Sequence, residues 1–317
     1  MNKILITRPL PTSVMQKAET LGDVSARAQT MPLSEKEMLS ALRDYDIILP
    51  TLGDLFSKEI FGQVETPKCK LLANFGVGYN HINVTAANSR GILVSNTPGA
   101  VTDATADIAL TLMLMTARRA GEGERLLRAG QWQGWHPIQM LGLHMSGKTV
   151  AIIGMGRIGE AIARRCHFGF GMQIVFASRS EKQMDFPAKQ FLSLKEAVVD
   201  ADFVVAAVPG GPATKHLVGR ELFASMPSHS IFVNISRGDV VDETALIAAL
   251  KMDQIGGAGL DVYEREPLVP DELIKLENVT LLPHLGTASL EVRTGMGDMA
   301  LKNIEDFIEG RSPTNLV

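Results

Sequence analysis

This chain of 317 residues has few cysteines, no excess of positive charge and no long apolar run. Its two cysteines, Cys69 and Cys166, stand apart from each other and from any histidine cluster, which argues against a disulfide framework and a zinc site. The net charge of −4 predicts no basic face for nucleic acid. No apolar run reaches the length of a membrane span, and residues 3–7 already have the pattern of a strand. We therefore expect no metal ion, no nucleic-acid partner and no membrane segment, and a location in the reducing cytoplasm.

What the sequence does have is the size and balance of a folded protein with two domains. Apolar residues make up 45% of the chain and charged residues 21%, as in ordinary globular proteins. A chain of this length can bury two separate hydrophobic cores.

The first hundred residues alternate short apolar runs with stretches of helical spacing, which predicts a small doubly wound α/β unit. Thr12 and Ser34 are candidate N-caps of the first two helices. The expected strands are residues 4–7, 47–50, 71–75 and 92–95, and the expected helices are residues 12–20, 34–42 and 84–89.

A second αβ series follows a long apolar segment, residues 102–120, which we expect to be a buried connecting helix. Residues 130–147, rich in Gly, Trp and His, are expected to leave the compact fold. Six strands are then expected, at residues 149–153, 173–177, 203–208, 231–235, 257–261 and 279–282.

The tail, residues 288–309, has helical spacing but cannot form a domain alone, so we expect it to pack back on the first unit. The predicted fold class is α/β, with two doubly wound parallel-sheet (Rossmann-like) domains. The first domain, residues 1–98 plus 287–317, is then discontinuous, and residues 99–286 form the second domain.

The most informative motif is Gly154-Met155-Gly156-Arg157-Ile158-Gly159, which directly follows an expected strand and opens an expected helix. In this context the three glycines allow a tight turn, close approach of the backbone to a pyrophosphate, and close packing of helix on sheet. The N-terminus of the helix offers unpaired N–H groups to the phosphates. The motif therefore predicts that the chain binds a dinucleotide. Residues 99–286 are then the dinucleotide-binding domain, and residues 1–98 plus 287–317 the substrate-binding domain.

The end of the next expected strand indicates which dinucleotide. A carboxylate that would hold the 2′-hydroxyl of the ribose in NAD is expected about 20 residues past the glycines. Here the sequence reads Ser178-Arg179-Ser180 instead. A guanidinium and two hydroxyls can bind a 2′-phosphate, so we expect NADP(H) to be preferred, with NAD(H) still possible.

Three polar residues follow expected strands of the second series, at the sheet edge where open α/β sheets bind ligands. Reduction of a 2-oxo acid needs a cation for the carboxylate and carbonyl, a proton donor, and a carboxylate that orients the donor. Arg237, His284 and Glu266, respectively, fit these roles.

Several stretches of the chain resemble the D-isomer-specific 2-hydroxyacid dehydrogenase family. They include residues 72–81, 91–99 and 102–107, together with 234–238, 259–262, 266–267 and 282–286. The resemblance implies hydride transfer at a 2-oxo or 2-hydroxy carbon, with Arg237, Glu266 and His284 as the catalytic set. It is greatest to NADPH-dependent glyoxylate and hydroxypyruvate reductases, with 2-ketogluconate or another 2-oxo acid as the alternative substrate.

The resemblance also implies the remaining site residues. The substrate would be bound by Leu52, the backbone amides of Val77 and Gly78, Arg237, His284 and Thr287. The cofactor would be bound by Thr102, residues 154–159, Ser178, Arg179, Ser180, Val208, Pro209, Thr214, Ile235, Ser236, Asp261, His284 and Gly286.

Trp132 and Trp135 lie in the excursion, which resembles the dimer arm of the family, so we expect a homodimer. Two other readings use the same fold: a non-enzymatic, dinucleotide-sensing corepressor-like protein, and an amino-acid dehydrogenase. The second would need a lysine near the reacting carbon, and none of the three strand-end positions has one.

Overall fold

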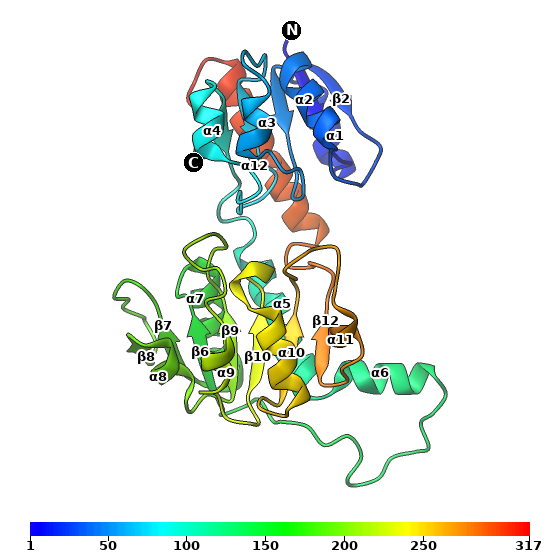
Figure 1. The fold of residues 1–317 in the computed structure, drawn as a ribbon, viewed down its shortest axis with the longest axis vertical. Helices are drawn as coiled ribbons and strands as arrows, with labels where there is room; N and C mark the ends of the chain where they lie inside the picture. The colour runs from blue at the N-terminus through cyan, green and yellow to red at the C-terminus, as the bar shows by residue number, and fades with distance from the viewer. The chain divides into compact units, whose positions relative to one another are not determined.

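A computed structural model describes all 317 residues and divides the chain into two compact units. Unit 1 comprises Met1–Val101 and Ala288–Val317, and unit 2 comprises Thr102–Thr287. Each contains one parallel sheet (Figure 1), which confirms the predicted α/β class with a discontinuous first unit. No helix is both long enough and apolar enough to cross a lipid bilayer.

Unit 1 is built on a five-stranded sheet in the order β2-β1-β3-β4-β5. Its strands are β1 (Lys3–Ile6), β2 (Asp23–Ala26), β3 (Ile47–Leu49), β4 (Leu71–Ala73) and β5 (Leu93–Ser95). Its helices are α1 (Thr12–Ala18), α2 (Glu35–Asp44), α3 (Lys58–Gly62), α4 (Val84–Ser89) and α12 (Leu290–Ile308).

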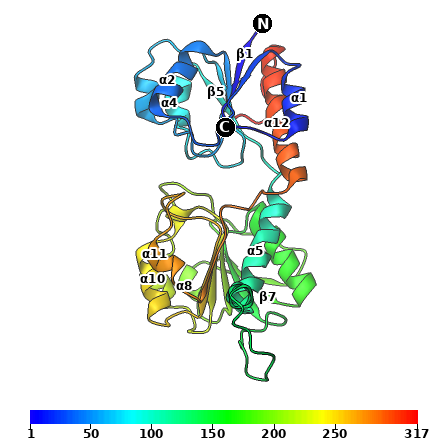
Figure 2. The ribbon, with the colours of Figure 1, turned by 90° about the vertical axis from the view of Figure 1, so that its right-hand side faces the viewer.

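Two apolar clusters hold these layers together, one on each face of the sheet. Helices α1 and α12 cover one face, while α2 and α4 cover the other (Figure 2). Ile6 and Leu49 point toward α12, where Ala300 and Ile304 meet them, and Leu5 belongs to the opposite cluster. Because successive side chains in a strand alternate between faces, a short all-apolar strand supplies both cores.

Unit 2 is built on a seven-stranded sheet in the order β12-β11-β10-β9-β6-β7-β8. Its strands are β6 (Thr149–Ile153), β7 (Gln173–Ala177), β8 (Ala188–Phe191), β9 (Phe203–Ala206), β10 (Ile231–Asn234), β11 (Gly257–Leu260) and β12 (Val279–Leu281). Its helices are α5 (Thr102–Ala117), α6 (Ala120–Arg128), α7 (Arg157–Arg164), α8 (Leu194–Val198), α9 (Arg220–Phe223), α10 (Glu243–Lys251) and α11 (Asp271–Ile274). Helix α5 is buried against the sheet, as the sequence predicts, and packs on the same face as α7.

The chain order of the strands reverses at β6, which lies between β9 and β7. In open α/β sheets this reversal point is where ligands bind, beyond the carboxyl ends of the strands. The glycine motif follows β6 at that position.

Several local predictions need correction. Seven strands form in unit 2 rather than six, and five in unit 1 rather than four, because the edge strands β8 and β2 escaped prediction. The buried connecting helix ends at Ala117 rather than at residue 120, and a separate helix, α6, follows it. Thr12 is not an N-cap, since Pro11 holds that place without a side-chain hydrogen bond. Ser34 does cap α2, in a reciprocal capping box with Glu37.

Candidate active site

The glycine turn after β6 has the geometry that a bound pyrophosphate requires. Gly154 has a φ of +99°, and a Cβ there would lie 2.7 Å from the carbonyl oxygen of Ala207. A Cβ on Gly159 would lie 2.1 Å from the carbonyl oxygen of Gly154, so α7 packs directly on the turn. A Cβ on Gly156, in contrast, would meet nothing within 4 Å. The open side of Gly156 at the N-terminus of α7 therefore leaves room for phosphate oxygens.

The loop after β7 contains no carboxylate at its first three positions and is organised by a glutamine from β8. The Ser178 hydroxyl donates to the Ser180 carbonyl oxygen at 2.6 Å. The Gln190 side-chain amide donates to both the Ser178 hydroxyl and the Ser180 carbonyl oxygen, each at 3.0 Å. Arg179 is exposed on this loop. The Ser-Arg-Ser segment thus has a fixed backbone and presents its guanidinium to solvent.

Arg237, Glu266 and His284 follow β10, β11 and β12, which are neighbours in the sheet. All three strands are parallel, so their carboxyl ends meet at one edge. Glu266 and His284 form a hydrogen bond of 2.8 Å between Oε2 and Nδ1. Arg237 lies close enough for the Glu266 charge to favour its protonated form. The structure therefore brings the three predicted catalytic side chains together within unit 2.

Burial and charge act against each other at this edge. Burial alone would raise the pKa of Glu266, but the hydrogen bond from His284, the charge of that imidazole and the charge of Arg237 outweigh it and hold the pKa below its usual value. Burial lowers the pKa of Arg237, opposed by the charges of Glu266 and Asp239. The resulting arrangement holds an ionised carboxylate against Nδ1 of the His284 imidazole, at 2.8 Å.

Further hydrogen bonds hold the loops on which these three residues lie. The Tyr263 N–H donates to Glu266 Oε1 at 3.1 Å, and the Tyr263 hydroxyl donates to the Leu282 carbonyl oxygen at 2.9 Å. Tyr263 thus ties the loop after β11 to the end of β12. On the other side, the buried Asn234 side chain accepts from the Ser236 N–H and donates to the Arg237 carbonyl oxygen, both at 3.0 Å.

The sequence of unit 2 matches a known family. Residues 110–286 match the family description "D-isomer specific 2-hydroxyacid dehydrogenase, NAD binding domain", which covers more than half of the chain. The chain belongs to the D-isomer specific 2-hydroxyacid dehydrogenase family. This confirms the resemblance noted from the motifs, and it identifies the protein as an oxidoreductase that binds a nicotinamide dinucleotide.

Relatives are similar over almost their whole length. The glyoxylate reductase of Pyrococcus horikoshii is 41% identical over 322 residues, which cover 99% of this chain and 95% of the relative. The crystal structure of an NADPH-dependent glyoxylate/hydroxypyruvate reductase from Sinorhizobium meliloti, in complex with NADP and malonate, is 31% identical with a TM-score of 0.88 and covers 100% of this chain and 96% of that one. A glyoxylate reductase from Paecilomyes thermophila is 30% identical with a TM-score of 0.87, covering 100% and 98%.

Other residues that the family resemblance assigns to the cofactor lie along the same sheet edge of this dehydrogenase. Val208 and Pro209 follow β9, where the Val208 N–H donates to the Ser236 hydroxyl at 2.9 Å. The Thr214 hydroxyl donates to the Pro209 carbonyl oxygen at 2.6 Å. Ile235 is buried in the core cluster that contains α5.

The N-terminus of α5 and the loop after β12 also meet at this edge. Thr102 begins α5, and Thr105, one turn further, donates to the carbonyl oxygen of Gly286 at 3.3 Å. Asp261 is buried, with its carboxylate engaged by the N–H groups of Leu285 and Gly286. Thr287 follows directly at the end of unit 2.

The residues predicted from unit 1 are Leu52, Val77 and Gly78. Leu52 is half-buried after β3, and its carbonyl oxygen accepts from the Arg8 guanidinium at 2.5 Å. Val77 and Gly78 lie in the loop after β4. In unit 2, sequence reasoning missed three side chains that hold the loops after the strands, namely Gln190, Tyr263 and Asn234. No local pattern in a sequence shows which carbonyl group a distant amide or hydroxyl will reach.

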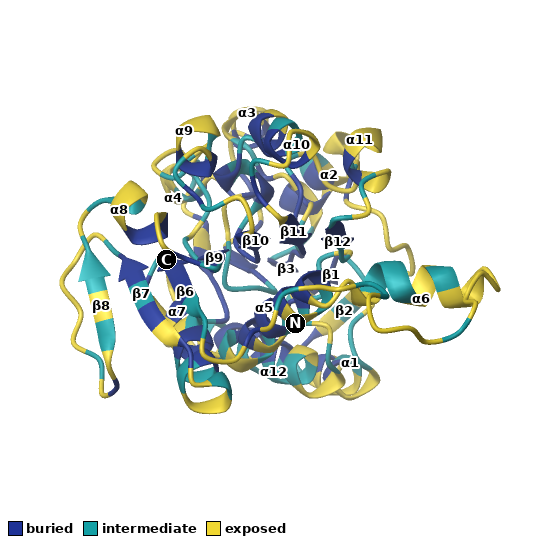
Figure 3. Ribbon diagram, turned by 90° about the horizontal axis from the view of Figure 1, so that it is seen from below, coloured by how far each residue is buried: buried dark blue, intermediate teal, exposed yellow.

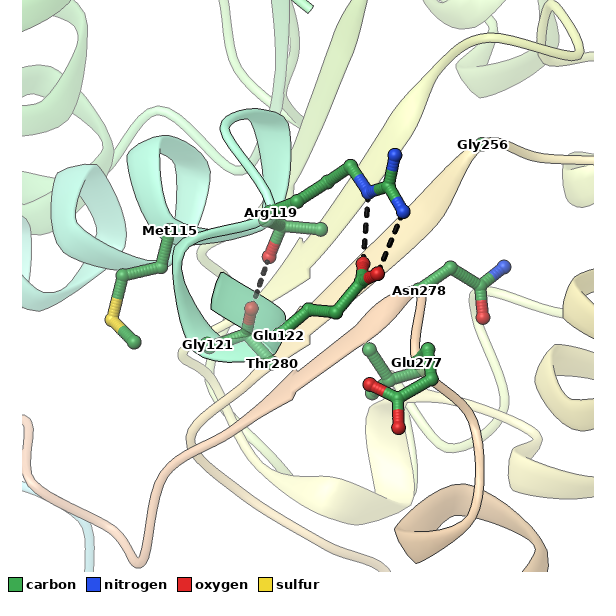
Figure 4. A pocket seen from close by; sticks show the side chains of 10 residues that line it. Met115, Arg119, Gly121, Glu122, Gly256, Glu277, Asn278 and Thr280 are labelled. Carbon is green, nitrogen blue, oxygen red and sulfur yellow. Dashed lines mark hydrogen bonds and ion pairs between the residues drawn. The ribbon is translucent and has the colours of Figure 1, made fainter. Parts of the chain in front are cut away.

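A cavity of about 250 Å³ lies at the opposite end of the unit 2 sheet, beside the amino ends of β11 and β12. Its charged residues are engaged with other side chains: Arg119 forms two hydrogen bonds with Glu122, at 2.8 and 2.7 Å (Figure 4), and Glu277 pairs with Arg125. We assign this cavity no part in the chemistry. No group of three or more His, Cys, Asp or Glu side chains could hold a metal ion.

Proposed function

We propose that this protein reduces small 2-oxo acids, glyoxylate and hydroxypyruvate, to 2-hydroxy acids with NADPH. The observation that carries the proposal is the hydrogen-bonded Glu266–His284 pair beside Arg237, at the carboxyl ends of three neighbouring strands. Glyoxylate reductases that are about two-fifths identical over nearly the whole chain support the substrate class.

His284 is the proton donor in this proposal. When bound, a reduced nicotinamide supplies the hydride that reaches the 2-oxo carbon. The carbonyl oxygen then needs a proton, and an imidazole is suited to give it near neutral pH. Glu266 accepts from Nδ1, so the opposite ring nitrogen is the one available to the substrate. The carboxylate also stabilises the imidazolium before the transfer.

Arg237 binds the substrate and polarises its carbonyl group. A guanidinium offers a planar set of donors that matches a carboxylate and a neighbouring oxygen. Burial of Arg237 strengthens this interaction, since less water competes for the donors. Within unit 1, we propose the backbone amides of Val77 and Gly78 as donors for a carboxylate and Leu52 as an apolar contact. Within unit 2, we propose the Thr287 hydroxyl as a further substrate contact.

The preference for NADPH rests on the loop after β7. A 2′-phosphate would find the Arg179 guanidinium and the Ser180 hydroxyl there, and no carboxylate among residues 178–180 to repel it. Gln190 holds this loop in place. The open side of Gly156 fits the pyrophosphate of the same cofactor.

The deciding experiment is NADPH oxidation by the purified protein with glyoxylate, hydroxypyruvate, pyruvate and 2-ketogluconate. We expect the highest kcat/KM for glyoxylate or hydroxypyruvate. Faster turnover of 2-ketogluconate would move the proposal to the sugar-acid branch, and binding of NADPH without turnover of any acid would support a dinucleotide sensor instead. His284→Ala should abolish turnover while NADPH binding, followed by fluorescence, persists.

We further propose a homodimer formed through the segment after α6. Trp132, Trp135, Ile138 and Leu141 are exposed there, Trp135 to 80%. In Figure 3, α6 is coloured partly as intermediate and partly as exposed, and most of the segment that follows it is coloured as exposed. Exposed apolar residues gathered in one segment are typical of an interface. Trp135→Asp should convert a dimer to a monomer in sedimentation experiments, and a wild-type monomer would contradict this proposal.

A further inference from the structure

The loop after β4 in unit 1 has three consecutive carbonyl groups that are all held by hydrogen bonds. The Gly76 carbonyl oxygen accepts from Asn74 Nδ2 at 3.0 Å and from the Thr97 N–H at 3.1 Å. The Val77 carbonyl oxygen accepts from Asn96 Nδ2 at 2.9 Å. The Gly78 carbonyl oxygen accepts from Asn74 Nδ2 at 3.1 Å. Two asparagine side chains thus contact every carbonyl group of this short segment.

Holding these carbonyl oxygens also sets the direction of the next three N–H groups. In a planar trans peptide the C=O and N–H bonds point in opposite directions. The N–H groups of Val77, Gly78 and Tyr79 belong to the three peptides whose oxygens are held, so they point away from the asparagines. None of the three has an acceptor within the protein. Consecutive N–H groups of this kind form a concave site for an anion.

We infer that Asn74 and Asn96 are positioning residues for the substrate carboxylate, because they turn the N–H groups of residues 77–79 toward it. The inference rests on the proposed function, in which this loop binds a 2-oxo acid. Neither asparagine needs to touch the substrate. Each acts through the peptide whose oxygen it holds.

The asparagines are themselves rigidly held, so the donors are set before any substrate arrives. Both are buried, and the Asn96 N–H donates to the Asn315 carbonyl oxygen at 3.0 Å. The Asn96 carbonyl oxygen accepts from Asn303 Nδ2 at 3.1 Å, and Asn303 on α12 is 0% exposed. Preorganised donors bind an anion more strongly, since no ordering cost remains at the moment of binding.

Asn74 gives a second sign that the arrangement serves more than stability. Its Nδ2 bonds two carbonyl oxygens, while its buried Oδ1 has no hydrogen-bond partner. A buried acceptor without a donor destabilises the folded state. Such local costs are typical of segments that are shaped for a ligand.

Two substitutions at Asn96 separate positioning from a general effect on folding. Asn96→Leu keeps the approximate size but removes the donor, and we expect KM for glyoxylate to rise about tenfold while KM for NADPH stays unchanged. Asn96→Asp lacks the donor while the new carboxyl is ionised and regains it when that carboxyl is protonated. For each variant we divide KM for glyoxylate by the wild-type KM at the same pH. At pH 8 this ratio should be higher for Asn96→Asp than for Asn96→Leu, and at pH 5 it should be lower. Lost packing alone would not reverse this order with pH.

Asn88→Leu is the matched control, since Asn88 is an exposed asparagine on α4, and it should behave as wild type. An active wild type with an unchanged KM in Asn96→Leu, or no reversal of order with pH, overturns the inference alone. A wild type that reduces no 2-oxo acid overturns the proposed function first. If the variants do not fold, wild-type NMR decides: the amides of residues 77–79 should shift on addition of oxamate with NADP, and unshifted amides overturn the inference.

Discussion

Replacing Glu266 by glutamine removes one negative charge beside His284 and leaves the size of the side chain almost unchanged. The hydrogen bond of 2.8 Å from His284 Nδ1 would then end on a neutral amide oxygen instead of an ionised carboxylate oxygen. Two unit charges about 4 Å apart interact by about 4 kcal/mol at an effective dielectric constant of about 20. Exposed pairs contribute only about 0.2–1 kcal/mol. The side chains of His284 and Glu266 are 28% and 31% exposed, so this pair lies between the exposed and the shielded case. We therefore expect the substitution to remove about 1.4 kcal/mol of interaction energy, which corresponds to about one pH unit.

The sign of the effect follows from which form the carboxylate stabilises. Its pKa lies below the usual value, so Glu266 stays ionised throughout the neutral range and favours the protonated imidazole that gives the proton. Without that charge, the proton-donating state of the site loses this support. In a series from pH 5 to 10, we therefore expect the pH at which kcat/KM for glyoxylate falls to half to move down by about one unit in Glu266→Gln.

The control for this prediction is the neighbouring Glu264→Gln. Glu264 pairs with His216 at 2.8 Å rather than with His284, so its replacement should leave the pH profile in place. A Glu266→Gln profile that is only scaled down, with no change in its midpoint, would refute the reasoning. The same lowered pKa makes Glu266 stabilising above about pH 4.3, the usual value for Glu, and this contribution is lost as the pH falls through the folded-state pKa.

Three further changes test the arginine, the cofactor loop and the glycine turn. Arg237→Lys should lower kcat/KM for glyoxylate about 100-fold in steady-state assays, because an ammonium cannot make the two parallel bonds of a guanidinium. Ser178→Asp should lower the NADPH:NADH ratio of kcat/KM at least about tenfold, since a carboxylate repels a 2′-phosphate; an unchanged ratio would contradict the assignment. Gly159→Ala should lower both the melting temperature and the affinity for NADPH, because the new Cβ would lie 2.1 Å from a carbonyl oxygen of the turn. Gly169→Ala, whose Cβ would meet nothing within 4 Å, should change neither, and equal melting temperatures for the two variants would argue against the packing role.

The parts of the fold that could be predicted from sequence are those buried on both faces. Strands such as β6 and β9 are continuous apolar runs because helices cover both sides of the sheet, and such runs stand out in a sequence. The edge strands β2 and β8 are only partly buried and contain residues such as Asp23 and Lys189. Their pairing depends on the neighbouring strand rather than on their own composition, which is why prediction missed them.

The same distinction holds for the candidate site. Arg237, Glu266 and His284 could be predicted because each follows a recognisable strand, and parallel strands bring their carboxyl ends to one edge. The side chains that hold the loops could not be predicted in this way. Gln190 reaches Ser178, 12 positions earlier in the sequence, and Asn303 reaches Asn96 across 207 positions. Only the folded chain shows which backbone groups these amides meet.

The loop after β12 in unit 2 and the loop after β4 in unit 1 keep their conformation in the same way, through hydrogen bonds from buried polar side chains to the backbone. His284 has a φ of +55°, a region that L-residues seldom adopt and that persists only where the surroundings enforce it. Asp261, directly after β11, enforces it: its carbonyl oxygen accepts from the His284 N–H at 3.0 Å, and its carboxylate accepts from the N–H groups of Leu285 and Gly286 at 2.6 and 2.8 Å. Asn74 and Asn96 do the converse in unit 1, where side-chain donors hold carbonyl oxygens. In both units, buried polar side chains bind the backbone of a loop and hold its conformation. A mutation at Asp261 should therefore displace the imidazole even if it alters no group that reacts.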